Sequence, residues 1–128
     1  MAKSKQAKAK EISEKTKQIV LERQHYRSIS GVALTPYNVT YHQVISRGEQ
    51  GVGAEFNICA ITKEEHRLFH DKNDIPVNGR ERYSWIEFDI LMKNHLKLNY
   101  ENWTEQGCKY KPYKEFDEYG ITRRNGRL

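Results

Sequence analysis

The chain has 128 residues, a length that suits one small domain with a single hydrophobic core. Charged residues make up 30% of it and hydrophobic residues 37%, and no apolar run reaches the roughly 18 residues of a membrane-spanning helix. The first residues lack the apolar stretch of a secretory signal. We therefore expect a polar protein that works in the cytoplasm and has no membrane partner.

The net charge of the chain is +5, and the basic excess gathers at its two ends. Lysines dominate the first 24 residues, and a second cluster consists of Arg123, Arg124 and Arg127. Basic ends favour a polyanionic partner such as nucleic acid, although a lysine-rich start equally suits a role in solubility. The two cysteines, Cys59 and Cys108, match no metal-ligand spacing, so we expect free thiols.

Residues 3–24 contain strong helix formers and neither Gly nor Pro, which predicts a basic N-terminal helix that spans 1–24 and docks through its last turns. A turn signal at 35–38 leads into a predicted strand at 39–45, where β-branched and aromatic residues dominate.

Residues 47–54 hold three glycines and predict a flexible loop, after which 55–61 reads as a return strand of the same hairpin. Thr62 followed by Glu65 forms a capping-box pattern, which predicts a helix from Lys63 to about Asp71.

A second amphipathic pattern predicts a helix at 83–98, and the aromatic and basic tail at 101–128 is expected to wrap the body in extended form. Together with a central domain at 25–100, these elements predict a small single domain of the α+β class, with helices flanking a strand–strand–helix unit.

Three of the five histidines fall in this unit: His42 in the first strand, and His66 and His70 four residues apart on one helix face. Imidazoles in this arrangement suit zinc, nickel, manganese or iron. An isolated pair at this spacing is more often two surface histidines, but a hairpin directly before the helix brings a third histidine within reach. We therefore predict a metal site.

The stretch YHQVISRGEQGVGAEFNICAITKEEHRLFHD, residues 41–71, resembles the HNH or His-Me finger nuclease motif that is common in bacteriophage genomes. The resemblance rests on the order of its parts: a histidine-led pair, two apolar residues, a glycine-rich loop, an asparagine and a paired-histidine helix. It implies a ββα-metal module in a bacterial or phage-infected host cell. It also implies an endonuclease that hydrolyses phosphodiester bonds of double-stranded DNA with one divalent ion, Zn, Ni, Mn or Mg.

The resemblance also implies roles for single residues. His42, His66 and His70 fall on metal-ligand positions, and Asn57 falls on the asparagine that fixes the hairpin loop and orients the general base. The base itself falls on Gln43. Arg47, in the glycine loop, is a candidate contact to DNA phosphate.

Two departures from the family pattern stand out. Many relatives carry two C-x-x-C pairs around a structural zinc, but the corresponding stretches here are 28–31 and 62–65, which contain no cysteine, so no structural zinc is expected. The second departure is Gln43, because a carboxamide cannot take a proton from water at neutral pH. The resemblance therefore predicts either an attenuated or inactive nuclease, or a non-catalytic DNA-binding protein derived from one.

Several interpretations of Gln43 remain open. The chain is a natural pseudo-nuclease, or it uses Tyr41 or His25 as another base, or it carries a deliberate His-to-Gln substitution. A shifted register, with His42 as the base and Tyr41 as a ligand, is a further alternative. We prefer His42 as the ligand, because a protonated tyrosine binds such metals poorly. A basic adaptor protein without metal is the remaining hypothesis.

Overall fold

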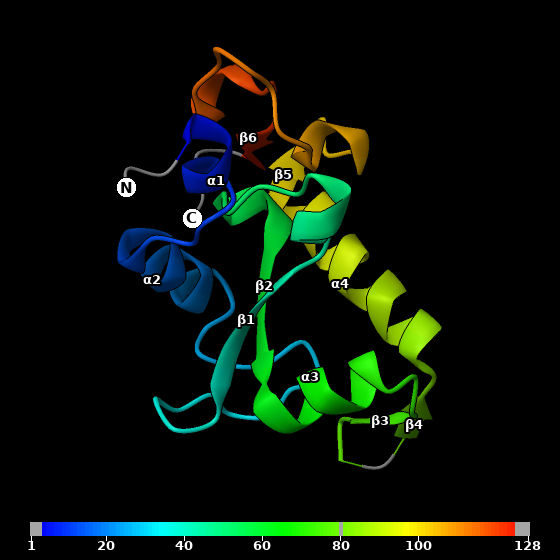
Figure 1. Cartoon of the computed structure of the whole chain (residues 1–128). Helices are drawn as coiled ribbons and strands as arrows, with labels where there is room; N and C mark the ends of the chain where they lie inside the picture. The colour runs from blue at the N-terminus through cyan, green and yellow to red at the C-terminus, as the bar shows by residue number, and fades with distance from the viewer. Residues whose placement is uncertain (1–3, 80, 125–128) are drawn as a thin grey trace.

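An antiparallel hairpin lies at the centre of the computed structural model, which describes residues 4–79 and 81–124 (Figure 1). Its strands are β1 (Val39–Gln43) and β2 (Ile58–Thr62), and their register sets His42 opposite Cys59. All five residues of β2 are buried, because helices flank the hairpin on two sides (Figure 1). The connection contains two single 3-10 turns, η1 (Arg47–Glu49) and η2 (Glu55–Asn57).

Helix α3 (Lys63–His70) begins directly where β2 ends. The Thr62 hydroxyl accepts a hydrogen bond from the Glu65 backbone N–H, and the Glu65 carboxylate accepts one from the Thr62 N–H, at 3.0 and 2.9 Å. This capping box satisfies donors that the first turn leaves unpaired. The helix predicted from Lys63 is confirmed, and it ends within one residue of the expected position.

A short hairpin of β3 (Ile75–Val77) and β4 (Glu81–Tyr83) follows α3, and the sequence did not predict it. Helix α4 (Trp85–Asn99) then confirms the second amphipathic prediction, and a Ser84–Glu87 capping box fixes its start.

The tail after α4 is only partly extended. Strand β5 (Tyr100–Glu101) pairs with β6 (Thr122–Arg123), and two 3-10 turns lie between them, η3 (Gln106–Cys108) and η4 (Phe116–Glu118). Its buried side chains close the main hydrophobic core, which includes Trp103, Cys108, Tyr119 and Ile121. The chain is thus a small single domain of helices and short antiparallel strands, in agreement with the predicted α+β class.

The N-terminal segment is not the single helix that the sequence predicted. It forms α1 (Lys5–Ala9) and α2 (Glu14–Arg23), with a break between them. The carbonyls of Ala9 and Lys10 accept hydrogen bonds from Gly53 N–H and the Gln43 side chain, instead of from the next helical turn. Ser13 then caps α2 by accepting from Thr16 N–H at 3.1 Å.

A buried hydrogen-bonded cluster joins the two stretches where the resemblance places cysteine pairs in relatives. The Glu65 carboxylate accepts hydrogen bonds from the hydroxyls of Ser28, at 2.5 Å, and Ser30, and all three residues are buried. We call this group the serine–glutamate clasp. It ties the segment before β1 to the start of α3 by hydrogen bonds alone.

Arg23 at the end of α2 is 4% exposed, and all five of its N–H groups are hydrogen-bonded. The acceptors come from four parts of the chain: the carbonyls of Glu55 and Ile58, and the side chains of Gln24, His95 and Tyr100. A buried guanidinium with every donor used ties α2 to the hairpin and to α4.

His95 gives the stability of the fold a dependence on pH. Burial, and then the charge of Arg23, lower its pKa to about 3, below the value of about 6.5 in an unfolded chain. The folded state therefore binds fewer protons than the unfolded state between these values. The stabilisation is present above pH 6.5 and is lost as the pH falls toward 3.

We expect His95→Gln to reduce this loss, because the amide oxygen still accepts from Arg23 but takes up no proton. Urea unfolding of both proteins at pH 7 and pH 5 measures the effect. The free energy of unfolding should fall less in the variant, by up to about 2 kcal/mol. His25→Asn, at an exposed position with φ of 54°, is the matched control. Equal losses in His95→Gln and the unaltered chain contradict the prediction.

Candidate metal centre

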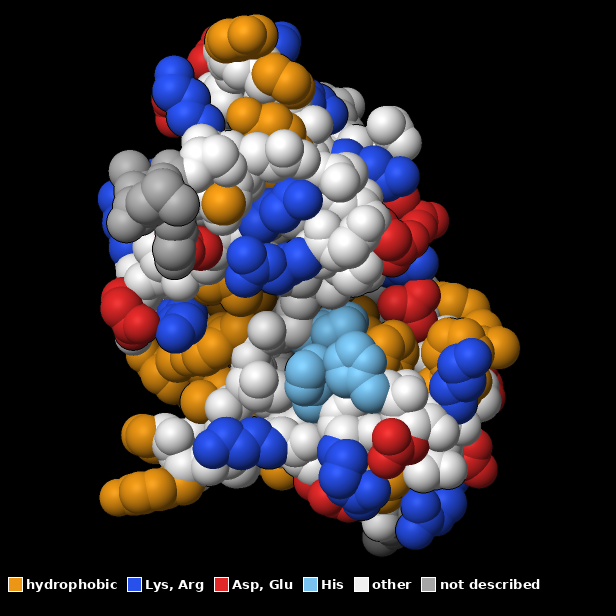
Figure 2. All heavy atoms as spheres, in the orientation of Figure 1, with side chains coloured by type: hydrophobic (Ala, Val, Ile, Leu, Met, Phe, Trp, Pro, Cys, Tyr) orange, Lys and Arg blue, Asp and Glu red, His pale blue; other side chains and the backbone are white. Residues whose placement is uncertain are grey.

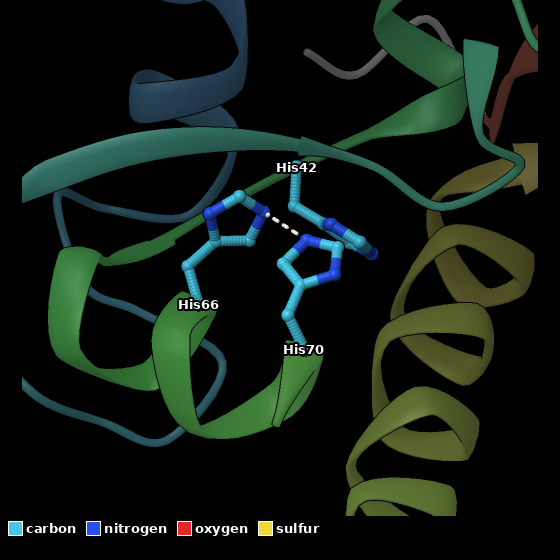
Figure 3. A group of neighbouring side chains, drawn as sticks. All are labelled: His42, His66 and His70. Carbon is cyan, nitrogen blue, oxygen red and sulfur yellow. Dashed lines mark hydrogen bonds between the residues drawn. The ribbon is translucent and has the colours of Figure 1, made fainter. Parts of the chain in front are cut away.

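Three histidine rings converge where β1 crosses α3 (Figure 3). His66 and His70 project from α3 with ring centroids 4.3 Å apart and Nε2 atoms 2.9 Å apart. The His42 ring lies 5.4 Å from that of His66 and 6.0 Å from that of His70. One ring nitrogen from each residue lies within 4.8 Å of the other two. The structure thus brings together all three predicted ligands.

Local structure explains this convergence. Helical spacing places His66 and His70 on one face of α3, and the pleat of β1 turns the His42 side chain toward that face. Phe69 packs edge-on against His42, with centroids 5.0 Å apart, and it also contacts Trp85 and Phe88 of α4. The aromatic contacts hold α3 between the hairpin and α4.

Burial favours the neutral form of two of these imidazoles, those of His42 and His66. It lowers the pKa of His42 to about 3, with smaller contributions from His66 and His70. Burial and the neighbouring His70 also lower the pKa of His66. Neutral imidazole is the form that binds metal, so protons do not compete at His42 and His66 at neutral pH.

The donor set fits one divalent transition-metal ion. Three imidazoles suit Zn, Ni or Mn, and three protein ligands leave coordination positions open for water or substrate. In the described part of the chain, His42 Nε2 is the buried side-chain nitrogen that has no hydrogen-bond partner. Buried polar atoms are normally satisfied, and a metal ion bound through this atom would satisfy it.

Asn57 fixes the loop of the hairpin, as predicted. Its buried carboxamide accepts from Ile45 N–H at 2.8 Å and donates to the carbonyls of Ile45 and Val52, at 3.0 and 2.8 Å. These bonds link both ends of the glycine-rich connection. The predicted second role of Asn57, orienting a base, stays a prediction.

Gln43 lines the same pocket as the three histidines. Its Nε2 donates a hydrogen bond of 2.6 Å to the carbonyl of Lys10, in the break between α1 and α2. The side chain at the position where the resemblance puts the general base is therefore held by the N-terminal segment.

The structure weighs against the alternative bases. Tyr41 lines the pocket, but burial raises its pKa, and Glu14 and Tyr26 raise it further, so the phenol stays protonated at neutral pH. His25 lines a different hollow, beside Leu98. His42 belongs to the histidine cluster, which favours the register with His42 as ligand.

The histidine cluster opens into a surface pocket of about 750 Å³. Arg47 lines this pocket, as a phosphate contact requires, and two further cations that the sequence did not single out, Lys10 and Lys17, also line it. Figure 2 shows the histidine side chains gathered at the surface between groups of Lys and Arg side chains. The lysine-rich start was visible in the sequence, but its position against the hairpin depends on tertiary contacts.

Two arginines of the C-terminal cluster make contacts within the domain. Arg123 forms a two-point ion pair with Glu55, at 2.7 and 2.8 Å, and Arg124 donates to the carbonyl of Lys97 at 3.1 Å. Arg127 lies outside the described residues. The first two arginines therefore contribute contacts within the domain. Cys59 and Cys108 are free and buried, as expected.

Comparisons with family models, with curated proteins and with solved structures found no match for this chain. Among the helices that the structure describes, none is long and apolar enough to cross a membrane.

Proposed function

We propose that the chain is a metal-dependent DNA endonuclease of the HNH type, whose cleavage Gln43 attenuates or abolishes. The observation that carries this proposal is the three-histidine cluster, built from one strand and the following helix at an open pocket with basic residues in its wall. The β1–β2–α3 arrangement is the one expected of a ββα-metal module.

In this proposal His42, His66 and His70 hold one divalent ion, which supplies positive charge against the phosphate and the leaving oxygen. The remaining roles fall to side chains around the site. Asn57 keeps the loop closed, Arg47 binds a phosphate oxygen, and the Gln43 amide oxygen accepts a hydrogen bond from water. Gln43 does not remove the proton, so the step that needs a base is slow.

The proposed partner is double-stranded DNA. Lys10, Lys17 and Arg47 around the pocket supply charge for the phosphate backbone, and binding should weaken steeply as the salt concentration rises. The protein would work in the cytoplasm of a bacterial or phage-infected cell.

A second candidate is a DNA-binding protein without catalysis. The specific observation that favours it is the hydrogen bond from Gln43 to the Lys10 carbonyl, which gives this side chain a structural task in place of a catalytic one. A plasmid-nicking assay with Mn, Mg, Ni or Zn separates the candidates when the unaltered chain and Gln43→His are compared. Cleavage by either protein supports the nuclease, and binding without cleavage by both supports the second candidate.

Metal content gives a test that does not depend on activity. We expect one divalent ion per chain, and we expect His66→Ala and His70→Ala each to weaken metal affinity by at least about tenfold, since loss of an outer-shell group alone costs that much. Elemental analysis after dialysis and competition with a chelating dye measure both. His25→Asn is the control and should keep the ion. Equal metal binding by all variants, or none by the unaltered chain, contradicts the proposed site and favours an adaptor without metal.

A further inference from the structure

Residues 9–12, from the last residue of α1 onward, pack against the glycine-rich connection of the hairpin. We call this segment the strap. Gly53 N–H donates to the Ala9 carbonyl at 2.8 Å, and Gln43 Nε2 donates to the Lys10 carbonyl at 2.6 Å. A Cβ atom at Gly53 would lie 1.9 Å from the Glu11 carbonyl oxygen. Only glycine allows this close approach, so the strap and the connection fit each other at this point.

The strap carries Lys10 to the pocket that holds the histidine cluster. Lys17 also lines the pocket, but it forms an ion pair with Glu14 at 3.1 Å and lies 5.4 Å from the centre of the Tyr41 ring. Arg47 is exposed on the connection itself. Three cations from two distant parts of the chain therefore surround one pocket, whose wall includes a single carboxylate, that of Glu11.

The charge of this pocket favours an anion. Lys17 is paired with Glu14, but Lys10 and Arg47 still outnumber Glu11 in the pocket wall, and pocket walls of low dielectric strengthen the field of the cations within. Arginine and lysine are the side chains that bind phosphate oxygens in proteins.

We propose that Lys10 and Arg47 bind the backbone phosphate of a nucleic acid in this pocket, and that Gln43 is a positioning residue that holds the strap. The proposal rests on the proposed function, because it names the group that the candidate metal centre would face. In this proposal Gln43 does not act as a base. It fixes the backbone of Lys10 and so positions the Lys10 side chain.

Inorganic phosphate is the probe, and the ¹⁵N-labelled full chain is titrated in EDTA, so that no metal contributes. We expect saturable shifts of the Gln43 side-chain amide and of the Gly53 backbone amide. Lys10→Ala and Arg47→Ala should each weaken phosphate binding by up to about 5-fold, the upper end for one partly exposed charge contact. Lys15→Ala, on α2 but outside the pocket lining, is the matched control and should bind as the unaltered chain does.

The positioning role of Gln43 has its own variant, Gln43→Met, which keeps the length of the side chain but removes the donor. We expect weaker phosphate binding and faster hydrogen exchange at Gly53 N–H, whose acceptor is in the strap. Combining Gln43→Met with Lys10→Ala should cost no more affinity than Lys10→Ala alone, because both act on the same contact. A purely structural role for Gln43 predicts additive losses.

A titration with a 16-base-pair DNA duplex in EDTA then shows whether the same residues bind a phosphodiester. We expect the variants to rank in the same order by DNA affinity as by phosphate affinity. Unchanged phosphate and DNA affinity in Lys10→Ala, or no saturable shift in the unaltered chain, overturns the inference even if the metal assay finds one ion per chain. Absence of metal together with the expected phosphate results overturns the proposed nuclease and leaves the anion site standing.

Discussion

On the proposed function, we expect the replacement of Gln43 with histidine to raise the rate of DNA cleavage by about 10²–10⁴-fold, the usual contribution of a general base. The reason is chemical: an imidazole with a pKa near 6.5 takes a proton from water at neutral pH, and a carboxamide does not. The structure adds a second reason. A histidine can donate one N–H to the Lys10 carbonyl, as Gln43 does at 2.6 Å, and keep the other nitrogen as an acceptor.

Supercoiled plasmid, nicked under single-turnover conditions with each of Mn, Mg, Ni and Zn, measures this gain. Gln43→Met is the control and should show none. The double variant Gln43→His, His66→Ala should lose the increase in cleavage rate, because it lacks one of the three proposed metal ligands. Strong cleavage by the unaltered chain, equal to that of Gln43→His, contradicts the attenuation. No cleavage by any of the proteins, with DNA binding retained, overturns the nuclease in favour of the DNA-binding candidate.

We expect the replacement of Arg23 with methionine to lower the free energy of unfolding by about 3–5 kcal/mol, because each buried acceptor left without a donor costs about 1–3 kcal/mol. This is a large part of the about 5–15 kcal/mol of an ordinary domain. Methionine fills much of the same volume, so the loss reports the five hydrogen bonds and not a cavity. Without the guanidinium, the carbonyls of Glu55 and Ile58 and the hydroxyl of Tyr100 lose donors. Buried polar groups without partners are costly.

Equilibrium unfolding in urea, followed by tryptophan fluorescence, measures the change. Arg27→Met is the matched control: Arg27 is exposed and makes one hydrogen bond of 3.1 Å, to the Gly31 carbonyl, so its loss should stay within about 0.5 kcal/mol. Similar unfolding midpoints for Arg23→Met and the unaltered chain would show that the buried guanidinium adds no net stability.

Local signals predicted the elements best. The capping box at Thr62 predicted the start of α3, because the bonds that fix a helix start lie within four residues. The amphipathic pattern of the chain predicted α4. The break in the N-terminal helix was missed for the opposite reason. Its cause is a hydrogen bond between Lys10 and Gln43, 33 residues apart, and no helix propensity records such a contact.

In the candidate site, too, the sequence predicted the residues that local spacing brings together and missed those that tertiary contacts bring in. Spacing within one helix and the order of the motif placed His42, His66 and His70 correctly. Lys10 is one of several lysines in a polar segment, and no local sequence pattern indicates that Lys10 lines the pocket while Lys15 does not. Arg23 likewise looked like a surface cation of a basic helix, since the acceptors that bury it come from β2, α4 and β5.

The serine–glutamate clasp has a consequence for how the protein handles metal. Hydroxyls and a carboxylate join the segment before β1 to α3, so neither chelation nor thiol oxidation breaks this link. The two segments are therefore joined whether or not an ion is bound at the histidine cluster, and an ion that binds there would add its binding free energy to a fold that these hydrogen bonds already close.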